Sequence, residues 1–173
     1  MLLLVILLIS VILGNINKNP VKLKLEKIWL CIVGAMIIIA GGVLIYFNID
    51  VLIVTRLIGN IFIIIFVFKN IKEISTFMIG LGYTLNSIVM ISNNGKMPVK
   101  LLGIISQEVI DARHSVLTDD TSFYWLADII KLPYPLSIGN YILSIGDVVS
   151  FIGLGIFMYK IFSEKLDYKF KLY

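Results

Sequence analysis

The sequence predicts an all-α, polytopic transmembrane helical bundle, and three observations support this fold class. Of the 173 residues, 59% are hydrophobic and only 15% are charged, whereas soluble globular chains carry roughly a quarter of charged residues. The mean hydropathy is +0.99. Several uncharged runs are long enough to cross a ~30 Å hydrocarbon core as helices. These features exclude a soluble globular domain.

Five membrane spans are predicted within one integral membrane domain, residues 1–173. They cover residues 1–17, 28–49, 51–68, 74–95 and 141–159. The first lacks the basic region and cleavage site of a secretory signal peptide, so we expect a retained helix. The third contains Arg56 near one end, from which its long side chain can reach the interface. The fifth contains Asp147 and is followed by Lys160.

The basic residues predict the orientation, because Lys and Arg concentrate in cytoplasmic loops. Ten of the fifteen fall in alternate loops, after the first, third and fifth spans: Lys18, Lys22, Lys24, Lys27, Lys69, Lys72, Lys160, Lys165, Lys169 and Lys171. The N-terminus is therefore expected outside and the C-terminus inside. The net charge of +4 is explained by topology, and no nucleic-acid partner is predicted. Cys31 stands alone, so an internal disulfide is excluded.

The outer loop, residues 93–140, is the expected location of any site. It holds five of the eleven acidic residues, the only histidine, three of the four prolines and one of the two tryptophans. Apolar residues at helical spacing predict an interfacial amphipathic helix over residues 99–117. A second short helix is expected to follow, with Thr118 or Asp119 as its cap and Phe123 and Trp125 among its apolar contacts.

Asp147 is the first candidate site residue. An ionisable group about two turns inside a membrane span costs several kcal/mol unless it is paired, hydrated or functional. Two structural alternatives stay open: Asp147 lies near enough to the outer surface to remain hydrated, or it caps a helix that begins at Val148.

Asp128 is the natural partner, because it lies on the same predicted side of the membrane. Two carboxyl groups at a dry interface cannot both ionise easily, so one pKa rises and the pair can act as an acid and a base toward water, as in aspartic proteases. The alternative is that Asp128 is solvated or pairs with Lys131.

Other polar and small residues give weaker signals. Asn86 lies inside the fourth span, where an interhelical hydrogen bond is its commoner role, although it could orient a substrate carbonyl. Asn94 and Gly95 indicate a turn. Glycines at positions 41, 42, 80, 82, 153 and 155 suggest notches for helix packing.

His114 could form a metal cluster with nearby aspartates at positions 111, 119 and 120. The spacing supports neither a zinc nor a di-iron site, so a hydrated interfacial histidine is favoured. The sequence predicts no metal and no cofactor.

Five short motifs follow the fourth predicted span: Asn-Gly-Lys-Met-Pro-Val at 94–99, Leu-Thr-Asp-Asp-Thr at 117–121, Trp-Leu-Ala-Asp at 125–128, Leu-Pro-Tyr-Pro at 132–135 and Ser-Ile-Gly-Asp at 144–147. In this order they resemble a family of small bacterial multi-pass membrane proteins catalogued as a domain of unknown function. The resemblance covers about residues 84–158 and implies a protein of the bacterial cytoplasmic membrane, without an established activity. The supporting site residues expected from these motifs and from the polar residues above are Asn86, Asn94, His114, Thr118, Asp119, Thr121 and Trp125.

The two aspartates also resemble those of lipoprotein signal peptidases, small helical membrane proteins with two catalytic aspartates at the outer face. Asp128 and Asp147 stand nineteen positions apart, and an outside-to-inside helix follows the second. Ser144 replaces that family's asparagine, its Gly-Asn-x-x-Asp-Arg stretch is missing before Asp128, and five spans are predicted where that family has four.

Two functions are therefore carried forward. The first is an aspartate-dyad hydrolase acting on a membrane-anchored peptide. The second is a non-catalytic scaffold or accessory subunit for a partner membrane protein, in which Asp147 accepts backbone hydrogen bonds or pairs with Arg113, Lys96 or Lys100. Both place the chain in the lipid bilayer. A complete transporter is disfavoured, because no inverted repeat is found.

Overall fold

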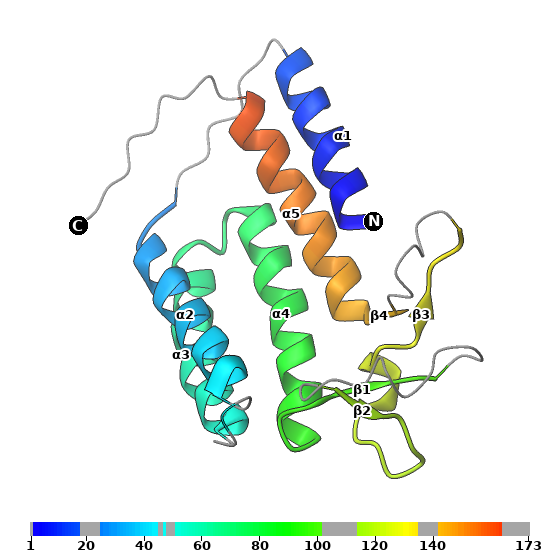
Figure 1. Ribbon diagram of the computed structural model, residues 1–173. Helices are drawn as coiled ribbons and strands as arrows, with labels where there is room; N and C mark the ends of the chain where they lie inside the picture. Colours follow the sequence, from blue (N-terminus) through cyan, green and yellow to red (C-terminus); the bar gives the residue numbers. More distant parts are fainter. Residues whose placement is uncertain are drawn as a thin grey trace.

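The computed structural model contains five α-helices and a small group of strands (Figure 1). It describes residues 2–17, 25–44, 47, 51–101, 114–134 and 142–163. The helices are α1 (Leu2–Ile16), α2 (Ile28–Leu44), α3 (Leu52–Lys69), α4 (Ile74–Ser92) and α5 (Ile145–Ser163). The prediction of a helical protein is confirmed, and each helix overlaps one predicted span.

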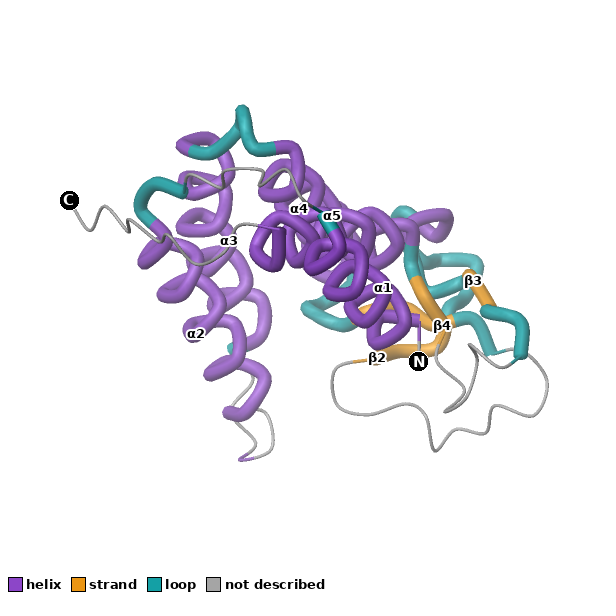
Figure 2. Tube along the Cα trace, turned by 90° about the horizontal axis from the view of Figure 1, so that it is seen from above, coloured by secondary structure: helices purple, strands orange, loops and turns teal. Residues whose placement is uncertain are grey.

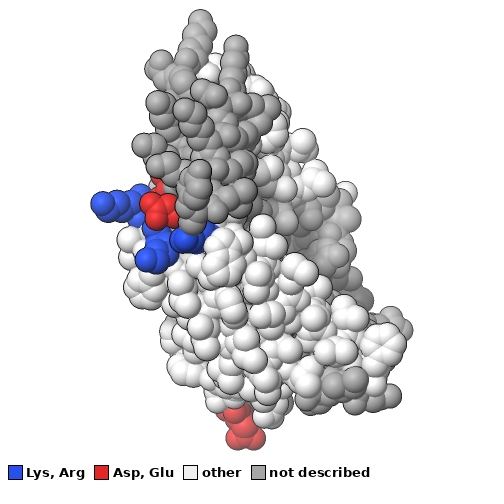
Figure 3. Space-filling model, turned by 90° about the vertical axis from the view of Figure 1, so that its left-hand side faces the viewer, with Lys and Arg blue, Asp and Glu red and all other residues white. Residues whose placement is uncertain are grey.

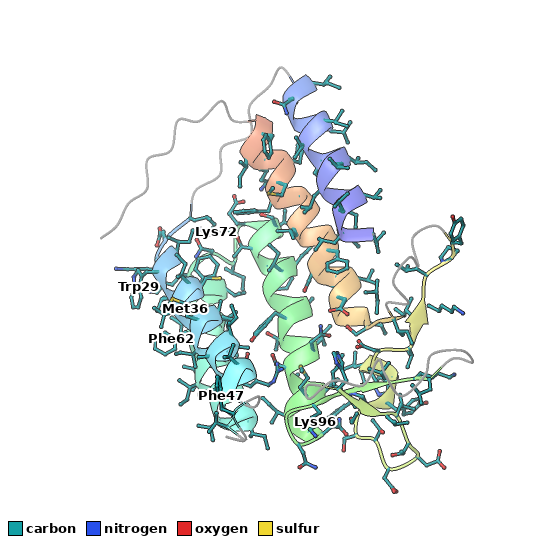
Figure 4. The ribbon with its side chains drawn as sticks, in the orientation of Figure 1. Trp29, Met36, Phe47, Phe62, Lys72 and Lys96 are labelled. Carbon is teal, nitrogen blue, oxygen red and sulfur yellow. The ribbon has the colours of Figure 1, made fainter. Side chains whose placement is uncertain are left out.

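Two helices, α4 and α5, are long and apolar enough to cross a membrane, each with 19 residues. The apolar helices α1 and α2 are shorter. On the face shown in Figure 3, Lys and Arg side chains gather around one acidic group at the left edge, a second acidic group projects at the bottom, and the described surface between them is uncharged. Lys72 and Lys96 lie beyond the two opposite ends of α4 (Figure 4).

The helices contact one another in the order α2, α3, α4, α5 and α1. Viewed from above, the α2–α3 pair stands beside the group formed by α4, α5 and α1, and the strands lie on the far side of that group (Figure 2). Small residues permit these contacts. A Cβ atom at Gly80 would meet Val67 of α3, and one at Gly82 would meet the carbonyl oxygen of Gly146. The predicted packing notches are confirmed at positions 41, 80, 82, 153 and 155.

The segment after α4 forms a cap of short strands, which we define as residues 93–101, 114–134 and 142–144. Its elements are β1 (Met97–Val99), β2 (His114–Val116), the 3-10 turn η3 (Tyr124–Leu126), β3 (Ile130–Lys131) and β4 (Ile142–Leu143). Strands β1 and β2 are parallel, and β3 and β4 are antiparallel. A further parallel bridge joins Val99 to Asp128. The cap therefore links α4 to α5 through backbone pairing.

The predicted helices of the outer loop differ from the structure. Val99, the first residue of the amphipathic helix expected over 99–117, lies in β1, and His114–Val116, near its end, form β2; residues 102–113 lie outside the described part. The prediction of a second short helix is wrong, because only the 3-10 turn η3 forms there. Phe123 adopts a left-handed φ of 54°, which ends a right-handed helix, and Asp128 pairs with β1 instead.

Apolar side chains hold the cap against α4. Val89 of α4, Met97 of β1 and Leu126 of η3 form one buried cluster. Asn93 adds a polar link, because its side-chain amide donates to the Ser122 carbonyl at 3.0 Å and accepts from the Ser122 N–H at 3.1 Å. The cap is thus fixed to the last turn of α4.

Candidate functional site

Asp147 lies in the first turn of α5, where it takes part in a capping box. The Ser144 hydroxyl accepts a hydrogen bond from the Asp147 N–H at 2.9 Å, and Oδ2 of Asp147 accepts one from the Ser144 N–H at 3.1 Å. These reciprocal bonds satisfy donors that a helix N-terminus leaves open, and a negative charge there is also favoured by the helix dipole. The helix begins at Ile145, so the expected depth of two turns was wrong, as was the alternative start at Val148.

Asn86 connects this turn to α4. Its Nδ2 donates to Oδ1 of Asp147 at 2.7 Å, and its Oδ1 accepts from the Ser144 hydroxyl at 2.7 Å. The amide can reach α5 because residue 146 is a glycine: a Cβ atom at this position would collide with the Asn86 side chain. Both carboxylate oxygens of Asp147 therefore accept hydrogen bonds, and the carboxylate is held in one orientation. The interhelical role expected of Asn86 is what the structure shows.

Asp128 is delivered to the same place by the strands of the cap. Its N–H donates to the Pro98 carbonyl at 3.0 Å, and its own carbonyl accepts from the Lys100 N–H at 2.9 Å. The next residue, Ile129, donates to the carbonyl of Leu143 at 3.2 Å. Leu143 immediately precedes Ser144, so this pairing lays Asp128 beside the N-terminus of α5.

The Asp128 side chain is buried, with 7% of the residue exposed, so the solvated alternative is wrong. Its Oδ1 atom has no hydrogen-bond partner among the residues that the structure describes. Burial, and then the negative charge of Asp147, raise the pKa of Asp128 to about 7. Near neutral pH, Asp128 can therefore hold or release a proton next to an oriented carboxylate.

The other expected site residues have different surroundings. Thr118 and Thr121 close a turn in which the Thr121 hydroxyl accepts from the Thr118 N–H at 2.9 Å. Asp119, beside this turn, is exposed. His114 is a half-buried residue of β2. These positions belong to the body of the cap.

Two further expected residues lie on its surface. Asn94 is exposed and takes a left-handed φ of 56° in the turn after α4. Trp125 is also exposed, although the sequence suggested an apolar contact.

Ser144 is the site residue that sequence reasoning missed. It is fully buried and contacts both Asp147 and Asn86. The signal was present, because Ser-x-x-Asp directly before an apolar run is the pattern of a capping box.

The fold and the site define a class of protein: a helical chain with two helices able to span a membrane, and a strand-built cap that holds the buried Asp128 within electrostatic reach of Asp147. The chain belongs to the family of unknown function DUF5317, whose model matches residues 22–160. This confirms the expected membership in a family without an assigned activity. No curated protein and no solved structure shows significant similarity to the chain.

Proposed function

We propose that the protein is an aspartate-dyad hydrolase, peptidase-like, at the outer membrane–water interface. The observation that carries this proposal is the buried carboxyl group of Asp128, whose Oδ1 lacks a hydrogen-bond partner among the described residues. Burying a carboxyl group in this way lowers the stability of the fold, and the group makes no hydrogen bond that offsets the loss. Its coupling to Asp147 gives it a chemical use.

The two carboxyl groups suit different roles because their surroundings differ. Asp147 accepts hydrogen bonds at both oxygens and serves as the base that takes a proton from water. Asp128, with a pKa of about 7, serves as the acid. The water oxygen bonds to the scissile carbonyl carbon while Asp128 protonates the carbonyl oxygen. Transfer of the proton from Asp147 to the leaving nitrogen then breaks the carbon–nitrogen bond, while one hydroxyl of the diol intermediate returns its proton to Asp128, so that both products are released and the two carboxyl groups regain their starting states.

The substrate class follows from the position of the site. Asp147 lies in the first turn of α5 beside Asn86, which is six residues before the end of α4. Asp128 lies in the cap that joins these two helices, which are the ones long enough to cross a membrane. A membrane-anchored peptide can present its backbone there. We further propose that the protein lies in the bacterial cytoplasmic membrane, crosses it five times and has its N-terminus outside. The ten basic residues that follow the first, third and fifth predicted spans support this orientation.

A non-catalytic scaffold is the second candidate, and the capping box favours it. The Ser144 N–H donates to Asp147, which is the kind of backbone bond that a purely structural Asp147 would make. In this case the cap is a rigid docking platform for a partner membrane protein. Burial of the Asp128 carboxyl group would then lower the stability of the fold without serving a function.

The deciding experiment measures new peptide termini in membranes of the native host. Cells lacking the chromosomal gene are complemented with the parent, Asp128→Asn, Asp147→Asn or Asp119→Asn, and quantitative mass spectrometry compares their membrane proteomes. Asp119 is an exposed aspartate of the cap and is the matched control. Protein abundance is followed in parallel, so that loss of the protein is separated from loss of activity.

The hydrolase predicts termini that appear with the parent and with Asp119→Asn but disappear with either dyad variant at equal abundance. Identical termini in all four strains would overturn it.

A further inference from the structure

Three consecutive aromatic residues project from the cap, and we call them the aromatic patch: Phe123, Tyr124 and Trp125. Their exposed fractions are 45%, 61% and 51%. Ordinary surface positions rarely present three large aromatic side chains in a row. The sequence from Ser122 to Ala127 carries no charge. The patch is therefore apolar, with polar atoms at the tips of Tyr124 and Trp125.

The backbone is arranged to expose these side chains. Phe123 takes the left-handed φ of 54°, a conformation that is an outlier for a bulky residue and persists only where its surroundings hold it. Asn93 holds the preceding residue through both backbone groups of Ser122. The Phe123 carbonyl accepts from the Leu126 N–H at 2.9 Å. The turn thus directs Leu126 inward and the aromatic patch outward.

The depth of the patch relative to α4 is also fixed. Leu126, directly after the patch, is buried against Val89, which lies three residues before the end of α4 at Ser92. Asn93, the first residue beyond α4, holds Ser122 on the other side of the patch. The patch therefore lies at the level of the last turn of a helix whose length matches the hydrocarbon core.

We propose that the aromatic patch inserts into the headgroup region of the bilayer at the outer end of α4. Tyr and Trp are enriched at this boundary because one part of each ring system is apolar and another part hydrogen-bonds to water or headgroups. The inference rests on α4 crossing the membrane and does not depend on hydrolysis. Asp128 follows Trp125 by three residues, so insertion of the aromatic patch keeps Asp128 near the lipid–water boundary.

Tryptophan fluorescence tests this placement directly, because the chain contains two tryptophans. The full-length Trp29→Phe variant, in which Trp125 is the only tryptophan, is reconstituted into phosphatidylcholine–phosphatidylglycerol vesicles. The vesicles carry nitroxide lipids labelled either near the headgroup or near the chain middle, and iodide is the aqueous quencher. In the reciprocal Trp125→Phe variant, Trp29 is the remaining tryptophan. Trp29 lies at one end of α2, and Phe47 lies beyond the other end (Figure 4).

The expected result is a large loss of Trp125 emission with the shallow nitroxide, a smaller loss with the deep one, weak quenching by iodide and a blue-shifted maximum. Strong iodide quenching without any effect of the nitroxide lipids would overturn the proposal and leave the patch as a surface for a protein partner. Stronger quenching by the deep nitroxide than by the shallow one would also overturn it.

Discussion

Asn86 and Asp147 stand 61 positions apart in the sequence, and their side chains are joined by a hydrogen bond of 2.7 Å. The bond crosses to the first turn of α5 from a position six residues before the end of α4. Because the same amide also accepts from Ser144, it ties together the two members of the capping box. The orientation of the Asp147 carboxylate is thus set by two helices at once.

The Asn86→Ala variant should lose both of these contacts. We expect the free energy of unfolding to fall by about 1–3 kcal/mol, since two polar groups at a partly buried site lose their partner. Denaturant unfolding in micelles measures this. Asn15→Ala is the matched control, because Asn15 is exposed and, among the described residues, its side chain donates to the Val11 carbonyl of its own helix alone. Equal losses in the two variants would contradict a special role for Asn86.

The close contact of α4 and α5 predicts the effect of Gly146→Ala. The new Cβ would collide with the Asn86 side chain and approach the Gly82 carbonyl to 2.6 Å, so we expect Asn86 to be displaced from Asp147. Gly155→Ala provides a steric control on the same helix, because its Cβ would meet Ile6 of α1 at 2.8 Å. Both variants should unfold at lower temperature. Only Gly146→Ala should alter the titration of Asp128, and an unchanged titration would count against the contact.

The buried carboxyl of Asp128 predicts a pH-dependent stability. Its pKa is raised from 3.8 to about 7 in the folded protein, so between these values the folded state binds more protons than the unfolded state. Stability therefore decreases as the pH rises from about 4 to 7, with the full cost present above pH 7. At about 1.4 kcal/mol for each pKa unit, a rise of about 3.2 units costs at most about 4.5 kcal/mol.

Asp128→Asn should remove this dependence. We expect the variant to match the parent near pH 4 and to be the more stable of the two at pH 8, as measured by thermal unfolding in micelles across this range. Asp119→Asn should keep the parental slope. An Asp128→Asn variant that is less stable than the parent at pH 8 would show that the carboxylate stabilises the fold.

The two hydrogen bonds between Asn93 and Ser122 predict local protection of the cap. In Asn93→Ala the Ser122 N–H loses its acceptor, so its hydrogen exchange should accelerate strongly. The amide of Thr84, in the middle of α4, should exchange as in the parent. Unchanged exchange at Ser122 would mean that the cap is held by its apolar contacts alone.

Hydropathy predicted the helices because the backbone N–H and C=O groups of a long uncharged run, away from water, must form hydrogen bonds within the run, and a helix provides them. The strands of the cap could not be predicted in the same way. They are two or three residues long, so none shows a period, and their partners are distant in the sequence.

The candidate site could be predicted in part. Asp147 and Asp128 attract attention as carboxyl groups in apolar surroundings, but only the pairing of Ile129 with Leu143 brings them together. The capping box of Ser144 was readable from its local pattern. The contact of Asn86 with this box depends on the meeting of Gly82 and Gly146, which sequence spacing alone does not specify.

The titration of Asp128 tests the proposed dyad most directly. Protein labelled with ¹³C at the aspartate carboxyl carbons is titrated in micelles by NMR, and the Asp128 signal is identified by its loss in Asp128→Asn. We predict half-protonation near pH 7 and a lower midpoint in Asp147→Asn. That midpoint should stay above the ordinary value of 3.8, because burial is the larger cause of the shift. An Asp128 that titrates near pH 4, or whose midpoint does not respond to Asp147→Asn, would contradict the pairing of the two carboxyl groups.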